Sequence, residues 1–134
     1  MVQYTGKYQL EKNENFVEFI KSLGQEIPAE MLEKLNKTKS IFEVQVNGDD
    51  VKFISHSSSG STHTTNFTFD KTFTEETLAG IKLQTTPKKD GDKIVLSANF
   101  GAKTGDRIYE FSDDGLVVSF TAGGVVGKRI YKRL

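Results

Sequence analysis

The chain has 134 residues, 18 of them basic and 18 acidic, so its formal net charge is zero. This length suits one domain with its own core, and we expect a single domain over residues 1–134. A neutral chain lacks the excess positive charge on which general nucleic-acid binding depends. The absence of cysteine excludes disulfides, a thiol nucleophile and a thiolate metal site.

The first residues, Met1 to Tyr4, show no apolar signal segment, and no run approaches the length needed to span a membrane. We therefore expect a soluble, cytoplasmic protein. We also expect a monomer.

The N-terminal third predicts one strand followed by two short helices. Residues 4–11 alternate as a strand does. A helix is expected over residues 16–23 because Asn15 is a plausible N-cap and apolar residues then follow with helical spacing. Pro28 suits the first turn of a second helix over residues 28–36. The apolar stripe of the helix pair would comprise Phe16, Phe19, Ile20, Met31 and Leu35.

From Ser40 onward the pattern predicts one strand after another. Turn signals such as Asn47-Gly48 and Asp90-Gly91 separate short alternating segments. About ten strands at this spacing favour an antiparallel barrel or sandwich. The expected strands after the helices cover residues 41–46, 51–55, 65–69, a short piece at 73, 81–86, 93–100, 106–112, 116–122 and 125–132.

The last hairpin allows a prediction of register. If Gly123-Gly124 forms a two-residue turn, Val118 faces Arg129 and Leu116 faces Tyr131. Residues directly opposite each other point to the same side of a sheet. The two polar residues are therefore expected on the apolar face that Val118 and Phe120 define.

The turn before that hairpin extends the same face. A two-residue turn at Asp114-Gly115 would pair Tyr109 with Phe120 and Arg107 with Ala122. Two arginines then lie on an apolar face, which is costly unless a negative group meets them. No acidic residue of these three strands falls on that face. Either one register is wrong by a residue, or the face lines a cavity and the counter-ion arrives as a ligand.

Other possible sites carry less weight. His56 and His63 have no cysteine or third histidine with which to complete a metal site. The adjacent carboxylates Glu75 and Glu76 are interpreted as a solvated pair in a turn region. No nucleophile–base pair is visible, so we expect neither an enzyme nor a bound cofactor or metal.

Three segments of the chain match, in order, motifs of a known family. Gly6–Leu10 with Asn15-Phe16 is similar to its N-terminal signature, Phe67–Glu76 to its middle motif, and Arg129–Tyr131 to its terminal Arg-x-Tyr anchor. The chain as a whole thus resembles the intracellular lipid-binding proteins, the fatty-acid-binding and cellular retinoid-binding group. One departure is that Tyr109 stands where many members have a second inward arginine.

The resemblance implies a mainly β fold, a ten-stranded antiparallel up-and-down β-barrel with a short helix-turn-helix lid between the first two strands. It also implies an intracellular carrier that binds long-chain fatty acids in an internal cavity. Arg129 and Tyr131 would anchor the carboxylate, and Arg107 or Tyr109 would be the third partner. The expected ligand-binding residues are Arg129, Tyr131, Arg107, Tyr109, Phe16, Ile20, Leu78, Val118 and Phe120.

Alternatives remain at this point. A carrier of retinoids or other isoprenoid acids needs the same apolar cavity and cationic anchor. An enzyme acting on an apolar substrate, or a binder of single-stranded nucleic acid, would be a different class of protein. Ligand entry is expected through the lid helices, which could also make transient contact with a membrane.

Overall fold

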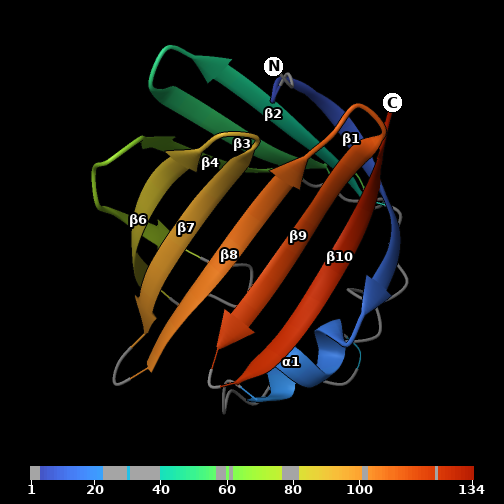
Figure 1. The fold of residues 1–134 in the computed structure, drawn as a ribbon, viewed down its shortest axis with the longest axis vertical. Coiled ribbons are helices and arrows are strands. Elements are labelled where there is room, and N and C mark those ends of the chain that lie inside the picture. The colour runs from blue at the N-terminus through green and yellow to red at the C-terminus, as the bar shows by residue number, and fades with distance from the viewer. Residues whose placement is uncertain are drawn as a thin grey trace.

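A computed structural model describes residues 4–22, 30, 40–56, 60, 62–76, 82–100, 103–122 and 124–134. Ten strands and the helix α1 lie within these residues and are joined by turns and loops (Figure 1). They are β1 (Gly6–Glu14), α1 (Phe16–Ser22), β2 (Ile41–Asn47), β3 (Asp50–His56), β4 (Thr62–Thr68), β5 (Phe73–Glu76), β6 (Lys82–Asp90), β7 (Lys93–Phe100), β8 (Lys103–Phe111), β9 (Gly115–Ala122) and β10 (Val125–Arg133).

The ten strands form one antiparallel sheet in the order β4-β3-β2-β1-β10-β9-β8-β7-β6-β5. The sheet curls into a nearly closed barrel, as Figure 1 shows. Nearly every pairing joins strands that follow each other in the chain. The exception is the pairing of β1 with β10, which brings Tyr8 opposite Arg133. The predicted ten-stranded barrel is therefore confirmed, and its two edge strands are β4 and β5.

Alternation along the strands places the core inside the barrel. In β2 the buried residues Phe42 and Val44 alternate with more accessible neighbours, and Ile94 and Leu96 do the same in β7. The buried cluster draws on strands all around the barrel and is rich in aromatic rings. It consists of Tyr4, Tyr8, Leu10, Phe42, Val44, Val51, Phe53, Phe67, Phe69, Ile94, Leu96, Tyr109, Phe111, Leu116, Val118 and Tyr131.

Helix α1 covers one end of the barrel (Figure 1). It begins after Asn15, whose carbonyl accepts a hydrogen bond from the Phe19 amide and whose side chain donates to the Val126 carbonyl on β10. Asn15 has a positive φ of 55°, a conformation that asparagine tolerates better than most residues. The predicted helix over 16–23 is confirmed to Ser22. The one expected over 28–36 lies outside the described residues apart from residue 30.

Several strand boundaries differ from those expected: β4 is Thr62–Thr68, β6 is Lys82–Asp90 and β8 is Lys103–Phe111. Two further differences lie near the inner wall of β8 to β10. Strand β1 continues to Glu14, because a β-bulge between Leu10 and Lys12 lets it follow β10 further. The turn between β8 and β9 is four residues long rather than two, since Phe111 pairs with Leu116. The expected register at that turn was wrong by two residues.

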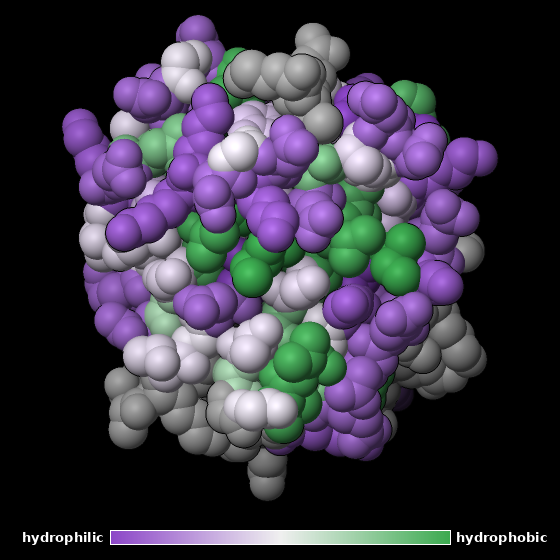
Figure 2. All heavy atoms as spheres, in the orientation of Figure 1, coloured by the Kyte–Doolittle hydropathy of each residue, from purple (hydrophilic) through white to green (hydrophobic). Residues whose placement is uncertain are grey.

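The outer surface of the barrel is mixed. Figure 2 shows mostly hydrophilic residues on one face, interrupted by apolar side chains. On β8 to β10 the half-buried Ile108, Val117 and Ile130 alternate with inward-facing neighbours. In the described part of the chain, no helix combines the length and the hydropathy needed to cross a membrane.

Candidate functional site

The hairpin of β9 and β10 sets the geometry of the site. Val118 lies opposite Arg129, and Leu116 lies opposite Tyr131, as predicted. Val118 and Leu116 are almost fully buried. Because paired residues share a face of the sheet, the Arg129 and Tyr131 side chains start from the inner wall of the barrel.

The contacts of Arg129 include two neutral groups. Its Nε donates a 3.0 Å hydrogen bond to Oδ1 of Asn13, the residue opposite it on β1. Its guanidinium carbon lies 4.6 Å from the centre of the Phe16 ring, which is cation–π distance. The β1 bulge and helix α1 thus both help to orient Arg129. Sequence reasoning did not identify Asn13, which lies beyond the point where strand β1 was expected to end.

Tyr131 is deeply buried beside Arg129. Its side chain is 8 % exposed and packs in the core cluster. Burial raises the pKa of the Tyr131 phenol above its ordinary value, and the positive charge of Arg129 opposes that rise. The hydroxyl therefore stays protonated near neutral pH and can donate a hydrogen bond.

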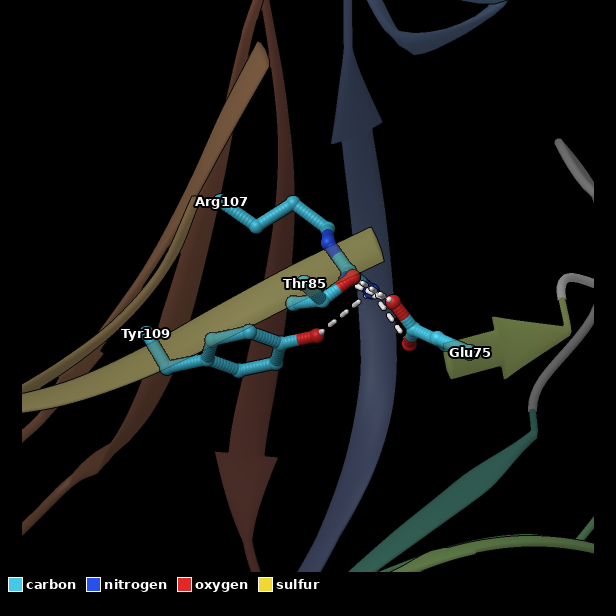
Figure 3. A network of polar contacts seen from close by, with 4 residues as sticks. All are labelled: Glu75, Thr85, Arg107 and Tyr109. Carbon is cyan, nitrogen blue, oxygen red and sulfur yellow. Dashed lines mark hydrogen bonds and ion pairs between the residues drawn. The ribbon is translucent and has the colours of Figure 1, made fainter. Parts of the chain in front are cut away.

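Arg107 lies on the same inner wall but has a counter-ion within the protein. Its Nη1 donates a 3.0 Å hydrogen bond to Oε2 of Glu75, and its Nη2 is paired with Oε1 (Figure 3). The two side chains are 20 % and 8 % exposed, so the pair is shielded from solvent. The interpretation that a ligand must supply the counter-ion is therefore wrong for Arg107.

The Glu75 carboxylate corrects a second expectation. Glu75 is 7 % exposed and lies on strand β5, so it is not part of a solvated pair in a turn. Thr85 on β6 donates a further 3.1 Å hydrogen bond to its Oε1. A signal for this burial was present in the sequence, because Glu75 lies two residues after the apolar Phe73 and period-2 alternation places both on one face.

Tyr109 completes this second group of residues. Its hydroxyl accepts a long, 3.5 Å hydrogen bond from Nη1 of Arg107, and Figure 3 shows the two side chains converging. Burial raises the pKa of Tyr109 to about 12. Burial alone would lower the pKa of Arg107, but Tyr109 and Glu75 raise it on balance above its ordinary value. The group therefore contains the Arg107–Glu75 ion pair beside the Tyr109 hydroxyl.

Aromatic rings connect the two polar groups. The Phe42 ring lies 5.9 Å, centre to centre, from both Tyr109 and Tyr131. At the helix end, Phe120 packs against Phe16 at 5.1 Å and against Phe19 at 5.7 Å. The predicted apolar residues Phe16, Val118 and Phe120 thus lie with the polar ones in the interior.

Two predicted site residues are not placed. Leu78 lies outside the described residues, and of Ile20 only the backbone in α1 is described. His56 Nε2 lies 3.2 Å from Oε1 of Glu43. Within the described ranges, no three histidine or acidic side chains gather as metal ligands would.

Comparisons with known proteins agree with this architecture. The model of the family described as "Lipocalin / cytosolic fatty-acid binding protein family" matches residues 2–134. Fatty acid binding protein 1-B.1 of Danio rerio is 37% identical over 134 residues, with 99% of each chain covered. A fatty acid-binding protein of Tyrophagus putrescentiae is also 37% identical, over 133 residues, again with 99% of each chain covered.

A solved structure shows the same fold. The fatty-acid-binding protein from brain tissue of Drosophila melanogaster superimposes with a TM-score of 0.85 and is 31% identical. The alignment covers 97% of this chain and 99% of that one. The likeness therefore extends over the whole barrel.

Proposed function

Because the chain belongs to the lipocalin and cytosolic fatty-acid binding protein family, we propose that it is a non-enzymatic carrier of long-chain fatty acids. Relatives at 37% identity carry names that state fatty-acid binding. The ligand would lie inside the barrel, with its carboxylate at Arg129 and Tyr131 and its tail against Phe16, Val118 and Phe120.

One observation carries this assignment: Arg129 and Tyr131 lie two residues apart on the same strand and share the inner face of the sheet. They face Val118 and Leu116 across the β9–β10 hairpin. A carboxylate placed there can accept from the guanidinium and from the protonated phenol, which together form a charge-assisted site. The tail removes apolar surface from water and contributes roughly 0.8 kcal/mol per buried methylene, so long chains are favoured.

The second inward arginine has a different role from the one first expected. Arg107 is already paired with Glu75. A ligand carboxylate that approached Arg107 would also approach the Glu75 carboxylate, and like charges repel. We therefore assign the carboxylate to Arg129 and Tyr131 and do not include Arg107 as its third partner.

Substitution of the anchor tests the proposal. The Arg129→Gln variant should bind oleic acid about 10- to 100-fold more weakly, because a charge-assisted hydrogen bond contributes roughly 1.5–3 kcal/mol. Isothermal titration calorimetry measures this affinity. Lys128→Gln is the matched control: it removes a cation from the adjacent, exposed position of β10 and should leave the affinity unchanged.

A second ligand separates the anchor from the tail. Methyl oleate keeps the tail but cannot bind as an anion, so it should bind wild-type protein more weakly and Arg129→Gln about as well as wild type. Equal affinity of the wild-type protein for the acid and its ester would rule out a carboxylate anchor. Retinoic acid, titrated in parallel, tests the isoprenoid alternative, which uses the same anchor.

A further inference from the structure

We propose that Glu75, Thr85, Arg107 and Tyr109 form a second polar subsite, which binds an uncharged oxygen along the ligand's chain. The preferred ligand class would then be oxygenated fatty acids, such as keto, epoxy or hydroxy acids. The inference rests on the proposed function, because it needs a fatty acid whose carboxylate is held elsewhere.

The first step is charge. Among the described residues, the ion pair of this group joins Arg107 to Glu75 through two contacts, so the two charges balance. An anionic ligand group placed here would meet the buried Glu75 carboxylate and be repelled. An uncharged group meets no such repulsion, and the subsite therefore selects neutral chemistry.

The second step is the balance of donors and acceptors. A guanidinium has five N–H donors. Within the described part of the chain, Nη1 contacts Glu75 and Tyr109, and Nη2 contacts Glu75. None of these contacts between described residues uses the Nε–H or the second Nη2–H of Arg107. Tyr109 uses its oxygen as an acceptor, so its contact with Arg107 does not use its own hydroxyl hydrogen either.

These hydrogens can be donated to a ligand oxygen. Tyr109 is 6 % exposed, and it shares the inner wall with Arg107. Glu75 cannot easily serve all of them, since its oxygens already accept from Arg107 and from Thr85. A carbonyl, ether or hydroxyl oxygen of a ligand would be a suitable hydrogen-bond acceptor.

The third step is position along the chain of the ligand. In the sheet, Arg129 faces Val118, and Val118 faces Tyr109 on the next strand. Two strand spacings separate Arg129 from Tyr109, which is about 10 Å between backbones. The Phe42 ring touches both Tyr131 and Tyr109. A tail that leaves the carboxylate anchor along Phe42 therefore passes the Tyr109 hydroxyl.

A positional series of ligands tests the proposal. Stearic acid is compared with keto stearic acids in which the carbonyl moves one carbon at a time along the chain. A buried carbonyl without a donor should weaken binding about tenfold or more. We expect that loss at most positions, and a short window of positions at which affinity returns to that of stearic acid or exceeds it.

Two variants identify the donor. Tyr109→Phe removes only a hydroxyl and should abolish the window: measured against stearic acid in the same variant, every keto acid should then show the loss. Tyr131→Phe, the matched control, removes the same group from the carboxylate anchor. It should weaken every ligand in the series by the same factor and keep the window in place.

An independent measurement needs no variant. Hydrogen bonding lowers the infrared stretching frequency of a ketone, so the carbonyl of an acid from the window should absorb at lower frequency when bound to wild-type protein than it does in hexane. Three results would overturn the proposal. The first is that a carbonyl weakens binding at every position, and the second is that the Tyr109→Phe variant shows the same window of positions as wild type. The third is that the bound ketone absorbs at the frequency that it has in hexane. Failure of stearic acid itself to bind would overturn the carrier function as well.

Discussion

The inner wall holds two arginines in different surroundings. Arg107 has a buried acidic partner on β5, and the contacts of Arg129 include the Asn13 side chain and the Phe16 ring. A buried ion pair is a poor source of net stability, because both charges lose their hydration. Loss of one partner is nevertheless severe, since it leaves a charge buried alone.

This asymmetry yields a prediction for Glu75. Glu75→Ala should lower the free energy of unfolding by about 3–5 kcal/mol, because Arg107 remains without its counter-ion. The double variant Glu75→Leu with Arg107→Met should recover most of that loss. Urea unfolding of the single and double variants measures both effects.

An exposed pair provides the control for Glu75. Lys12 and Glu14 lie 3.6 Å apart but are 64 % and 52 % exposed in their side chains. Glu14→Ala should therefore cost less than about 1 kcal/mol. A similar cost for Glu75→Ala and Glu14→Ala would show that burial adds nothing to the Arg107 pair.

The sequence predicted the pairing of residues correctly where the paired residues lie close together in the chain. The Gly123-Gly124 turn predicted that Arg129 pairs with Val118, and the pairing is confirmed. The β8–β9 register was wrong by two residues, but a shift of two keeps every side chain on its face. Arg107 and Tyr109 were therefore assigned to the correct wall. The pairing of Glu75 with Arg107 was not predicted, because Glu75 lies 32 residues from Arg107 in the chain, on another strand.

At the scale of elements, helix α1 depends on one close approach to β10. A Cβ on Gly127 would lie 2.9 Å from the Phe19 Cβ and 3.0 Å from the Asn15 carbonyl oxygen. Only glycine leaves room for the start of the helix at this point. Because α1 has seven residues, it is too short to be stable alone and relies on such docking.

Gly127→Ala should therefore loosen the helix. We expect a loss of about 1–3 kcal/mol in stability from overpacking, and faster amide hydrogen exchange in α1 than in the wild type. Exchange measured by NMR also compares elements: α1 should exchange faster than β9 and β10 without ligand, and more slowly once a fatty acid is bound.

The neighbouring residue serves as a control for Gly127. Val126 is 44% exposed, so Val126→Ala should change neither stability nor α1 exchange appreciably. If α1 in the ligand-free protein exchanged as slowly as β9 and β10, entry through a mobile helix would be excluded. The sequence predicted this helix because the spacing of its apolar residues is a local signal. Its contact with Gly127 is not local and could not be predicted in this way.

At the scale of the whole molecule, the buried tyrosines influence how stability depends on pH in the alkaline range. The chain has four tyrosines. Tyr4, Tyr8, Tyr109 and Tyr131 all have raised pKa values, with burial as the leading cause. In each case the folded state favours the neutral phenol.

Stability should consequently fall at high pH. An unfolded tyrosine ionises near pH 10, whereas Tyr109 in the fold does so near 12. The stabilising effect of its neutral phenol is present below the unfolded value and is lost as the pH rises through this window. The free energy of unfolding falls by roughly 2–3 kcal/mol because of Tyr109.

Urea unfolding midpoints measured from about pH 9 to 11.5 test this prediction. A constant midpoint, with phenolate absorbance appearing at the ordinary pKa, would contradict it.

The strand order allows the chain to be circularly permuted. Strands β4 and β5 follow each other in sequence but are the two unpaired edges of the sheet, while the terminal strands β1 and β10 pair. The Leu134 amide donates a hydrogen bond to the Lys7 carbonyl.

A circular permutant that joins the two original termini by a short linker and opens the chain between Lys71 and Thr72 would break no strand pairing. Every strand would then pair only with its sequence neighbours. Since folding is faster when contacts are local, stopped-flow refolding of this permutant should be faster than that of the parent. Equal or slower refolding would show that closing β1 on β10 does not limit the rate.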